Sequence, residues 1–122
     1  MLADKAQSLA TVVHVRDTGL PLTTSDQEWA RFCRQNRLVF ITEDQAIRRR
    51  PEEAEAFAKA RVGYVEVRIK AAVGAERLSV YASNADELIS LLDRTTPFCV
   101  VMTRSGIRDA QIGSRSRRRG VR

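Results

Sequence analysis

The chain has 122 residues, of which 43% are hydrophobic and 30% charged, and 21 Lys and Arg against 15 Asp and Glu give a net charge of +6. This length is enough for one domain whose core needs no disulfide or metal to hold it together. The sequence contains no apolar run of about 20 residues, which excludes a membrane span. Its first residues also lack the apolar segment of a secretory signal. We therefore expect a cytoplasmic protein.

The positive charge is concentrated at the C-terminal end. Seven arginines and one acid, Asp109, lie in residues 104–122, whereas the rest of the chain carries 14 basic and 14 acidic side chains. After Ser105 the sequence is rich in Gly, Ser and Arg and cannot bury enough apolar surface to fold. We expect a domain over residues 1–105 and a disordered tail over 106–122. Such a tail would add non-specific affinity for RNA or another polyanion.

The N-terminal third predicts a helix end over residues 2–9 and a strand over 11–15, Thr-Val-Val-His-Val. A loop containing Gly19 and Pro21 follows. A helix is then predicted from 26 to about 36, with Thr24 or Ser25 as its cap and Glu28 placed as in a capping box. The side chains expected to be buried in this helix are Trp29, Ala30, Phe32 and Cys33.

The remaining elements alternate between strands and helices. Residues 38–41 form a continuous apolar run, typical of a strand buried on both faces. Pro51 suits the first turn of a helix that runs to about residue 60, with Glu52, Glu53 and Glu55 near its N-terminus. A strand over 62–69, a helix over 75–92 broken near 83–84, and a strand over 98–102 complete the domain.

Strands that alternate with helices predict an α/β fold, a mostly parallel sheet with helices on both faces. In such a sheet the carboxyl ends of the strands lie along one edge, where ligands usually bind. Three acids are expected there, Asp17, Asp26 and Asp44. Carboxylates are the ligands that Mg²⁺ and Mn²⁺ prefer, and such an ion can activate water against a phosphodiester. Alternatively, Asp26 is a first-turn helix acid and Asp17 an ordinary turn residue.

Other sites are weaker candidates. Asp17-Thr18-Gly19 matches the tripeptide of aspartic proteases, but those enzymes need a second, equivalent carboxylate. Cys33 and Cys99 lie in apolar surroundings and, with His14 as the single histidine, give no zinc-ligand spacing; we expect both cysteines to be buried. Arg48, Arg49 and Arg50 follow Asp44. They could hold a nucleic-acid backbone or could pair with the glutamates of the next helix.

Several of these features together resemble the PIN-like domains of VapC-type toxins. In that group an Asp opens a helix with an aromatic residue soon after, and an apolar strand ends in Thr-x-Asp, followed by Ala-Ile and Arg-Pro-x-Glu. The matching residues here are Asp26, Trp29, Thr42-Glu43-Asp44, Ala46-Ile47 and Arg50-Pro51-Glu52-Glu53. The likeness is best over residues 11–70. It implies a Rossmann-like fold and an endoribonuclease dependent on Mg²⁺ or Mn²⁺, with Asp26 and Asp44 as catalytic metal ligands.

The same resemblance implies an RNA substrate, an antitoxin protein as partner and, in one possible assembly, a homodimer. PIN-like domains begin with a buried strand that ends in the first catalytic Asp, and residues 1–10 offer no counterpart to it. We therefore expect an N-terminally truncated domain. Two explanations stay open, a start codon upstream of Met1 or a true truncation. The second would leave a non-catalytic α/β module that binds an antitoxin-like protein or RNA.

Overall fold

The computed structural model describes residues 18–21, 23–69 and 74–112. The helix end predicted over 2–9, the strand predicted over 11–15, Asp17 and His14 lie outside these residues. In chain order the elements are α1 (Asp26–Asn36), β1 (Phe40–Thr42), the 3₁₀ helix η2 (Ile47–Arg49), α2 (Pro51–Ala60), β2 (Gly63–Val67), α3 (Gly74–Ser83), α4 (Ala85–Ser90), the 3₁₀ helix η3 (Leu91–Asp93), β3 (Phe98–Thr103) and β4 (Gly106–Asp109). None of the helices within the described ranges is long and apolar enough to cross a membrane.

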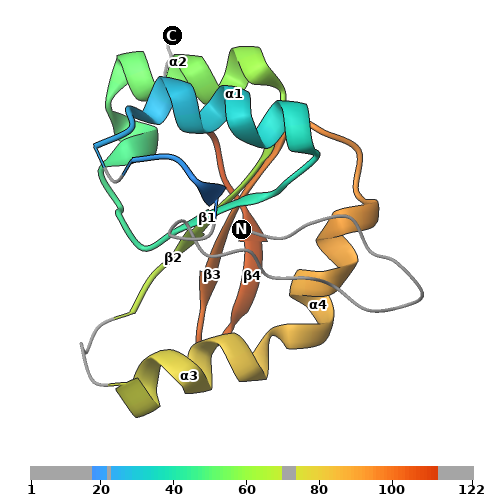
Figure 1. Cartoon of the computed structure of the whole chain (residues 1–122). Coiled ribbons are helices and arrows are strands. Elements are labelled where there is room, and N and C mark those ends of the chain that lie inside the picture. The colour runs from blue at the N-terminus through green and yellow to red at the C-terminus, as the bar shows by residue number, and fades with distance from the viewer. Residues whose placement is uncertain (1–17, 22, 70–73, 113–122) are drawn as a thin grey trace, which may run out of the picture.

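The strands form one sheet in the order β1-β2-β3-β4. β1, β2 and β3 are parallel, with Phe40 opposite Tyr64 and Tyr64 opposite Cys99, and β4 is antiparallel to β3. Helices α1 and α2 cover one face of this sheet, and α3 and α4 cover the other (Figure 1). The predicted α/β architecture, a mostly parallel sheet between two helical layers, is therefore confirmed.

Local chemistry sets the starts of the first two helices. Ser25 is the N-cap of α1: its side chain accepts a hydrogen bond from the backbone N–H of Glu28, and the Glu28 carboxylate accepts one from the backbone N–H of Ser25. This is the predicted capping box, with Ser25 rather than Thr24 as the cap. Pro51 occupies the first turn of α2, as expected from its fixed φ angle. Both helices end where the sequence predicts, at Asn36 and Ala60.

Both helices are followed by an arginine in the left-handed conformation. Arg37 has φ 56° and ψ 46°, and Arg61 has φ 58° and ψ 45°. Their backbone N–H groups donate to the last carbonyls of the helix, which closes the helix end. Glycine is the usual residue at this position, because a Cβ atom in this conformation costs about 1 kcal/mol.

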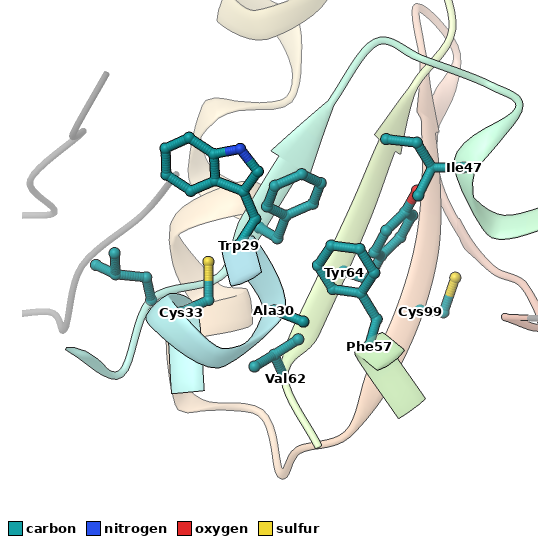
Figure 2. Packing of buried hydrophobic residues seen from close by; sticks show 10 residues of the cluster. Trp29, Ala30, Cys33, Ile47, Phe57, Val62, Tyr64 and Cys99 are labelled. Atoms are coloured by element: carbon teal, nitrogen blue, oxygen red, sulfur yellow. The ribbon is translucent and has the colours of Figure 1, made fainter. Parts of the chain in front are cut away.

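The core has one cluster on each face of the sheet. On the α1 and α2 side, one cluster contains Trp29, Phe57 and Tyr64, with the ring of Phe57 beside that of Tyr64 (Figure 2). On the other side Val65, Val80 and Met102 belong to a second cluster. Cys33 and Cys99 are both buried, which confirms that expectation. Phe32, expected to be buried, is half-buried instead, because its ring meets Trp29 edge-on at the rim of the cluster.

The expected boundary between domain and tail is wrong. Gly106–Asp109 forms β4, which pairs with β3 from Thr103 opposite Gly106 to Val100 opposite Asp109. Gly106 turns the chain with φ 143°, and Ile107 packs against the core cluster on the α3 side. Backbone pairing and the packing of Ile107, Ala110 and Ile112 on the core order a segment whose composition alone predicts a tail. Residues 113–122 lie outside the described part of the chain.

Candidate functional site

Asp26 and Asp44, the two acids predicted to share a site, come together at the carboxyl edge of the sheet. Asp26 is the first residue of α1, and Asp44 follows β1. Both face one guanidinium: Nη2 of Arg50 lies 3.6 Å from Oδ2 of Asp26 and 3.4 Å from Oδ2 of Asp44. Nε of the same arginine lies 3.6 Å from Oε1 of Glu53. The structure thus gathers three carboxylates around one cationic side chain.

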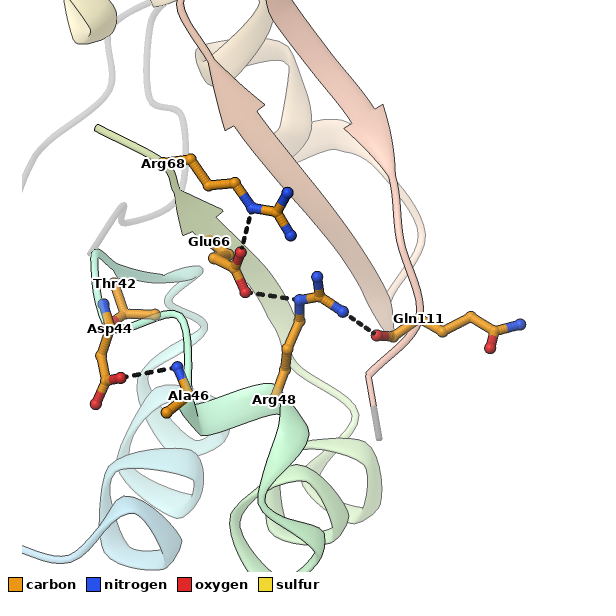
Figure 3. A network of polar contacts seen from close by, with 7 residues as sticks. All are labelled: Thr42, Asp44, Ala46, Arg48, Glu66, Arg68 and Gln111. Atoms are coloured by element: carbon orange, nitrogen blue, oxygen red, sulfur yellow. Dashed lines mark hydrogen bonds and ion pairs between the residues drawn. The ribbon is translucent and has the colours of Figure 1, made fainter. Parts of the chain in front are cut away.

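The loop after β1 holds Asp44 in place. Its backbone N–H donates to Oγ1 of Thr42 over 3.0 Å, and its Oδ1 accepts from the backbone N–H of Ala46 over 2.9 Å (Figure 3). This turn explains why Thr-x-Asp is useful at a strand end, since both side chains stabilise the loop. The second oxygen of Asp44 faces Arg50, and the side chain is 49% exposed. Asp44 can therefore contact a ligand from solvent.

Asp26 lies in an environment that is less favourable for a charged carboxylate than that of Asp44. Its side chain is 24% exposed. Burial raises the pKa of this carboxyl above its ordinary value; Arg50 opposes the shift, and the negative charges of Glu53 and Asp44 add to it. The folded protein thus keeps a carboxylate in a place where ionisation is disfavoured, which is common at functional sites.

The pKa of Asp26 leads to a prediction for Asp26→Asn. Because this pKa is raised on folding, ionisation of Asp26 lowers the free energy of unfolding. The loss begins as the pH rises above the ordinary pKa of 3.8 and is complete above the pKa of the folded state. An amide does not ionise, so the substitution removes that loss, and we expect the variant to be more stable than the parent at pH 7. Below pH 3.8 the difference should disappear. Urea unfolding at both pH values measures it, and a less stable variant at pH 7 would contradict the assignment.

Sequence patterns did not identify Glu66 as part of this edge. It lies on β2 with its side chain 0% exposed, and it accepts from Nε of Arg48 over 2.6 Å and from Nε of Arg68 over 2.8 Å. Figure 3 shows the two arginines reaching it from η2 and from the residue after β2. Arg48 also donates to the carbonyl of Gln111. The sequence did contain an indication of this site, because Glu66 is a charged residue within the apolar run that precedes Arg68.

The three consecutive arginines have different surroundings. Arg48 is bound to buried Glu66, Arg50 lies among the carboxylates, and Arg49 is exposed on η2. Of the glutamates considered as their partners, Glu53 pairs with Arg50, whereas Glu55 pairs with Lys59. The segment is therefore not one uniform basic patch, and its binding to nucleic acid stays a prediction.

The hydroxyl of Tyr64 lies under the same edge. It is a buried side-chain oxygen without a hydrogen-bond partner. Burial raises the pKa of this phenol, and the charges of Cys99, Glu66, Asp44 and Asp26 raise it further. The phenol therefore stays protonated.

Replacement of Tyr64 by phenylalanine tests that hydroxyl. Because an unpaired buried hydroxyl costs more than about 1 kcal/mol, we expect Tyr64→Phe to raise the free energy of unfolding by about 1 kcal/mol. Chemical denaturation at neutral pH measures the change. A loss of similar size would instead show that the hydroxyl has a hydrogen-bond partner in solution.

Asp26 and Asp44 suit the ligand chemistry of a hard divalent ion. Mg²⁺ usually keeps several waters and is held by one or two carboxylates together with substrate oxygens. Two carboxylate oxygens that reach one guanidinium nitrogen mark a place where a cation is favoured. Across residues 18–21, 23–69 and 74–112, no group of three or more His, Cys, Asp or Glu side chains is arranged to hold a metal. Water or phosphate oxygens would have to complete the coordination.

Comparisons with known proteins support one family. The model of the family described as "PIN like domain" matches residues 2–68, more than half of the chain. This range contains α1, β1 and α2, and therefore Asp26, Asp44 and Arg50. Searches of curated proteins and of solved structures gave no significant match.

Proposed function

Because the chain belongs to the PIN-like domain family, we propose that it is a metal-dependent endoribonuclease of the VapC toxin type. The observation that carries this proposal is the convergence of Asp26 and Asp44 on one cationic position at the carboxyl edge of the sheet. RNA is the proposed substrate, Mg²⁺ or Mn²⁺ the proposed cofactor, and an antitoxin protein and a second copy of the chain are the proposed partners.

In this mechanism Asp26 and Asp44 would hold the ion, and the ion would supply an activated water and stabilise the leaving oxygen. The turn from Thr42 to Ala46 orients the Asp44 carboxylate, and the start of α1 positions Asp26. Arg50 offsets one of the two negative charges of Asp26 and Asp44, and its side chain is 46% exposed. Its guanidinium can therefore move to solvent and donate to a phosphate oxygen, an interaction that suits its planar geometry.

One observation favours a second function. Arg50 already lies between Asp26 and Asp44 and offsets part of their negative charge. A chain that uses this pairing permanently would be a non-catalytic α/β module that binds RNA or an antitoxin-like protein.

Cleavage of RNA by Asp44→Asn distinguishes these functions. The parent in this assay is the chain extended upstream of Met1 by the strand and catalytic Asp with which PIN-like domains begin, because by the same resemblance those residues complete the site. With Mn²⁺ this parent is expected to cleave single-stranded RNA. Loss of a metal ligand should lower the rate roughly a hundredfold or more, since even the partners of metal ligands contribute about 10- to 100-fold. Asp86→Asn is the matched control, because Asp86 is an exposed acid in the first turn of α4. Gel assays with Mn²⁺ and with EDTA measure the rates. Equal activity of Asp44→Asn and the parent, or no activity in the parent, contradicts the proposed enzyme.

A further inference from the structure

An arginine stands before each of the three parallel strands. Arg37 lies between α1 and β1, Arg61 between α2 and β2, and Arg94 between η3 and β3. Because the strands are parallel, these connections meet at the amino edge of the sheet. Arg34, in the last turn of α1, joins them. Asp26 and Asp44 lie at the opposite edge, so these arginines form a separate cluster.

All four arginines line one cavity, which we call the arginine pocket. Its volume is about 450 Å³, within the size range of sites for small ligands. Apolar side chains from the strand starts and η3 contribute to its lining, among them Leu38, Val62 and Leu92. No acidic side chain belongs to that lining among the described residues. The pocket thus combines apolar surface with a concentration of positive charge.

Among the described residues, Arg94 is the one arginine of the four that has an ion-pair partner. Arg94 pairs with Asp109 over 2.7 Å, and its guanidinium lies 5.2 Å from the ring centroid of Phe98. Within the described residues no carboxylate forms an ion pair with Arg34, Arg37 or Arg61. The C-termini of α1 and α2 each add about half a negative charge. That is less than the charge of the three guanidiniums that have no ion pair with a described residue, so the pocket favours an anion.

The backbone gives an independent reason to look for a ligand. An arginine near a helix C-terminus stabilises the helix dipole, and this role alone could explain Arg34. Arg37 and Arg61, however, occupy left-handed positions at which glycine is the more stable residue. Two strained arginines at the same edge, both lining the same pocket, are better explained by recognition than by folding.

We propose that the arginine pocket binds the phosphate group of a nucleotide, with the base against the apolar lining. Guanidinium groups match phosphate oxygens in pairs of parallel hydrogen bonds. The nucleotide comes either free in solution or as part of an RNA strand. This site does not depend on RNA cleavage at Asp26 and Asp44, because it lies at the other edge of the sheet.

The test uses the full chain in EDTA, so that no cleavage occurs, and compares two double variants that each remove two positive charges. Arg37→Gly with Arg61→Gly alters the pocket, and Arg31→Gln with Lys59→Gln alters a different surface between α1 and α2. Matching the charge keeps the general attraction of a basic chain for polyanions equal. The probes are uridine 5′-monophosphate and a ten-nucleotide RNA with or without a 5′-phosphate, measured by isothermal titration calorimetry.

We expect the pocket variant to bind the mononucleotide at least tenfold more weakly than the control variant. Its unfolding midpoint in urea should equal or exceed that of the parent, since glycine relieves the strained positions, so lost binding is not lost folding. If the pocket takes a terminal nucleotide, the pocket variant should bind the 5′-phosphorylated RNA more weakly than the control variant does and the unphosphorylated RNA equally well. If the pocket takes an internal phosphate, the pocket variant should bind both RNAs more weakly. Affinities within twofold of the control variant for all three probes would overturn the proposal.

Discussion

Replacement of Glu66 by alanine is expected to lower the free energy of unfolding by about 3–5 kcal/mol. Glu66 is completely buried and compensates two guanidiniums, Arg48 at 2.6 Å and Arg68 at 2.8 Å. Arg48 is itself only 13% exposed, so its charge would remain without a partner in a largely dry place. The removal of one member of a buried ion pair costs more than the pair contributes, because the other charge stays buried. Urea unfolding of parent and variant measures the loss.

An exposed ion pair is the control for Glu66. Glu43 pairs with Arg77 over 2.8 Å, but both side chains are accessible to solvent. Exposed ion pairs contribute little because water screens the charges and the side chains lose freedom. We therefore expect Glu43→Ala to change the stability far less than Glu66→Ala. Equal effects of the two substitutions would mean that Glu66 is solvated in solution and that the Arg48–Glu66–Arg68 network does not form.

Phe57→Ala is expected to lower the free energy of unfolding by a similar amount, about 3–5 kcal/mol. Phe57 is 1% exposed, and its ring centroid lies 4.6 Å from that of Phe40 and 5.1 Å from that of Tyr64. These ring contacts join α2 to β1 and β2. Truncation leaves a cavity between these rings in addition to the lost transfer free energy of the phenyl group.

Leu78 supplies the control for Phe57. Its side chain on α3 is 71% exposed, so Leu78→Ala should stay within about 0.5 kcal/mol of the parent. Both variants are measured by urea unfolding at one pH. If Phe57→Ala costs no more than Leu78→Ala, helix α2 is not packed on the sheet as the structure has it.

The helices were predictable with good boundaries because their ends depend on nearby residues. The Ser25 and Glu28 capping box starts α1, and Pro51 starts α2. Strand boundaries were less predictable. Residues 38–41 and 62–69 were predicted, whereas β1 is Phe40–Thr42 and β2 is Gly63–Val67. A strand ends where its neighbour stops pairing, and the partner of β1 is 24 residues further along the chain, Phe40 opposite Tyr64.

The candidate site was predictable only in part. Asp26 and Asp44 follow from topology, because a helix start and a strand end in a parallel sheet meet at one edge. Their shared contact with Arg50 does not follow from spacing, nor does the burial of Glu66. The amino-edge arginines did have a signal that sequence analysis passed over, since Arg37, Arg61 and Arg94 each lie between a predicted helix and the next predicted strand.

The sequence by itself determined the order of helices and strands, the helix caps and the acids at the carboxyl edge. These features depend on residues a few positions apart or on the direction of the chain. Only the tertiary structure decided that Arg48 binds Glu66, 18 residues away, and that Arg48 also donates to the carbonyl of Gln111, 63 residues away. It also decided that residues 106–109 add a strand to the sheet. With 21 basic and 15 acidic side chains, many charge pairings are conceivable. Which of them form depends on how the packed sheet and helices bring distant segments together.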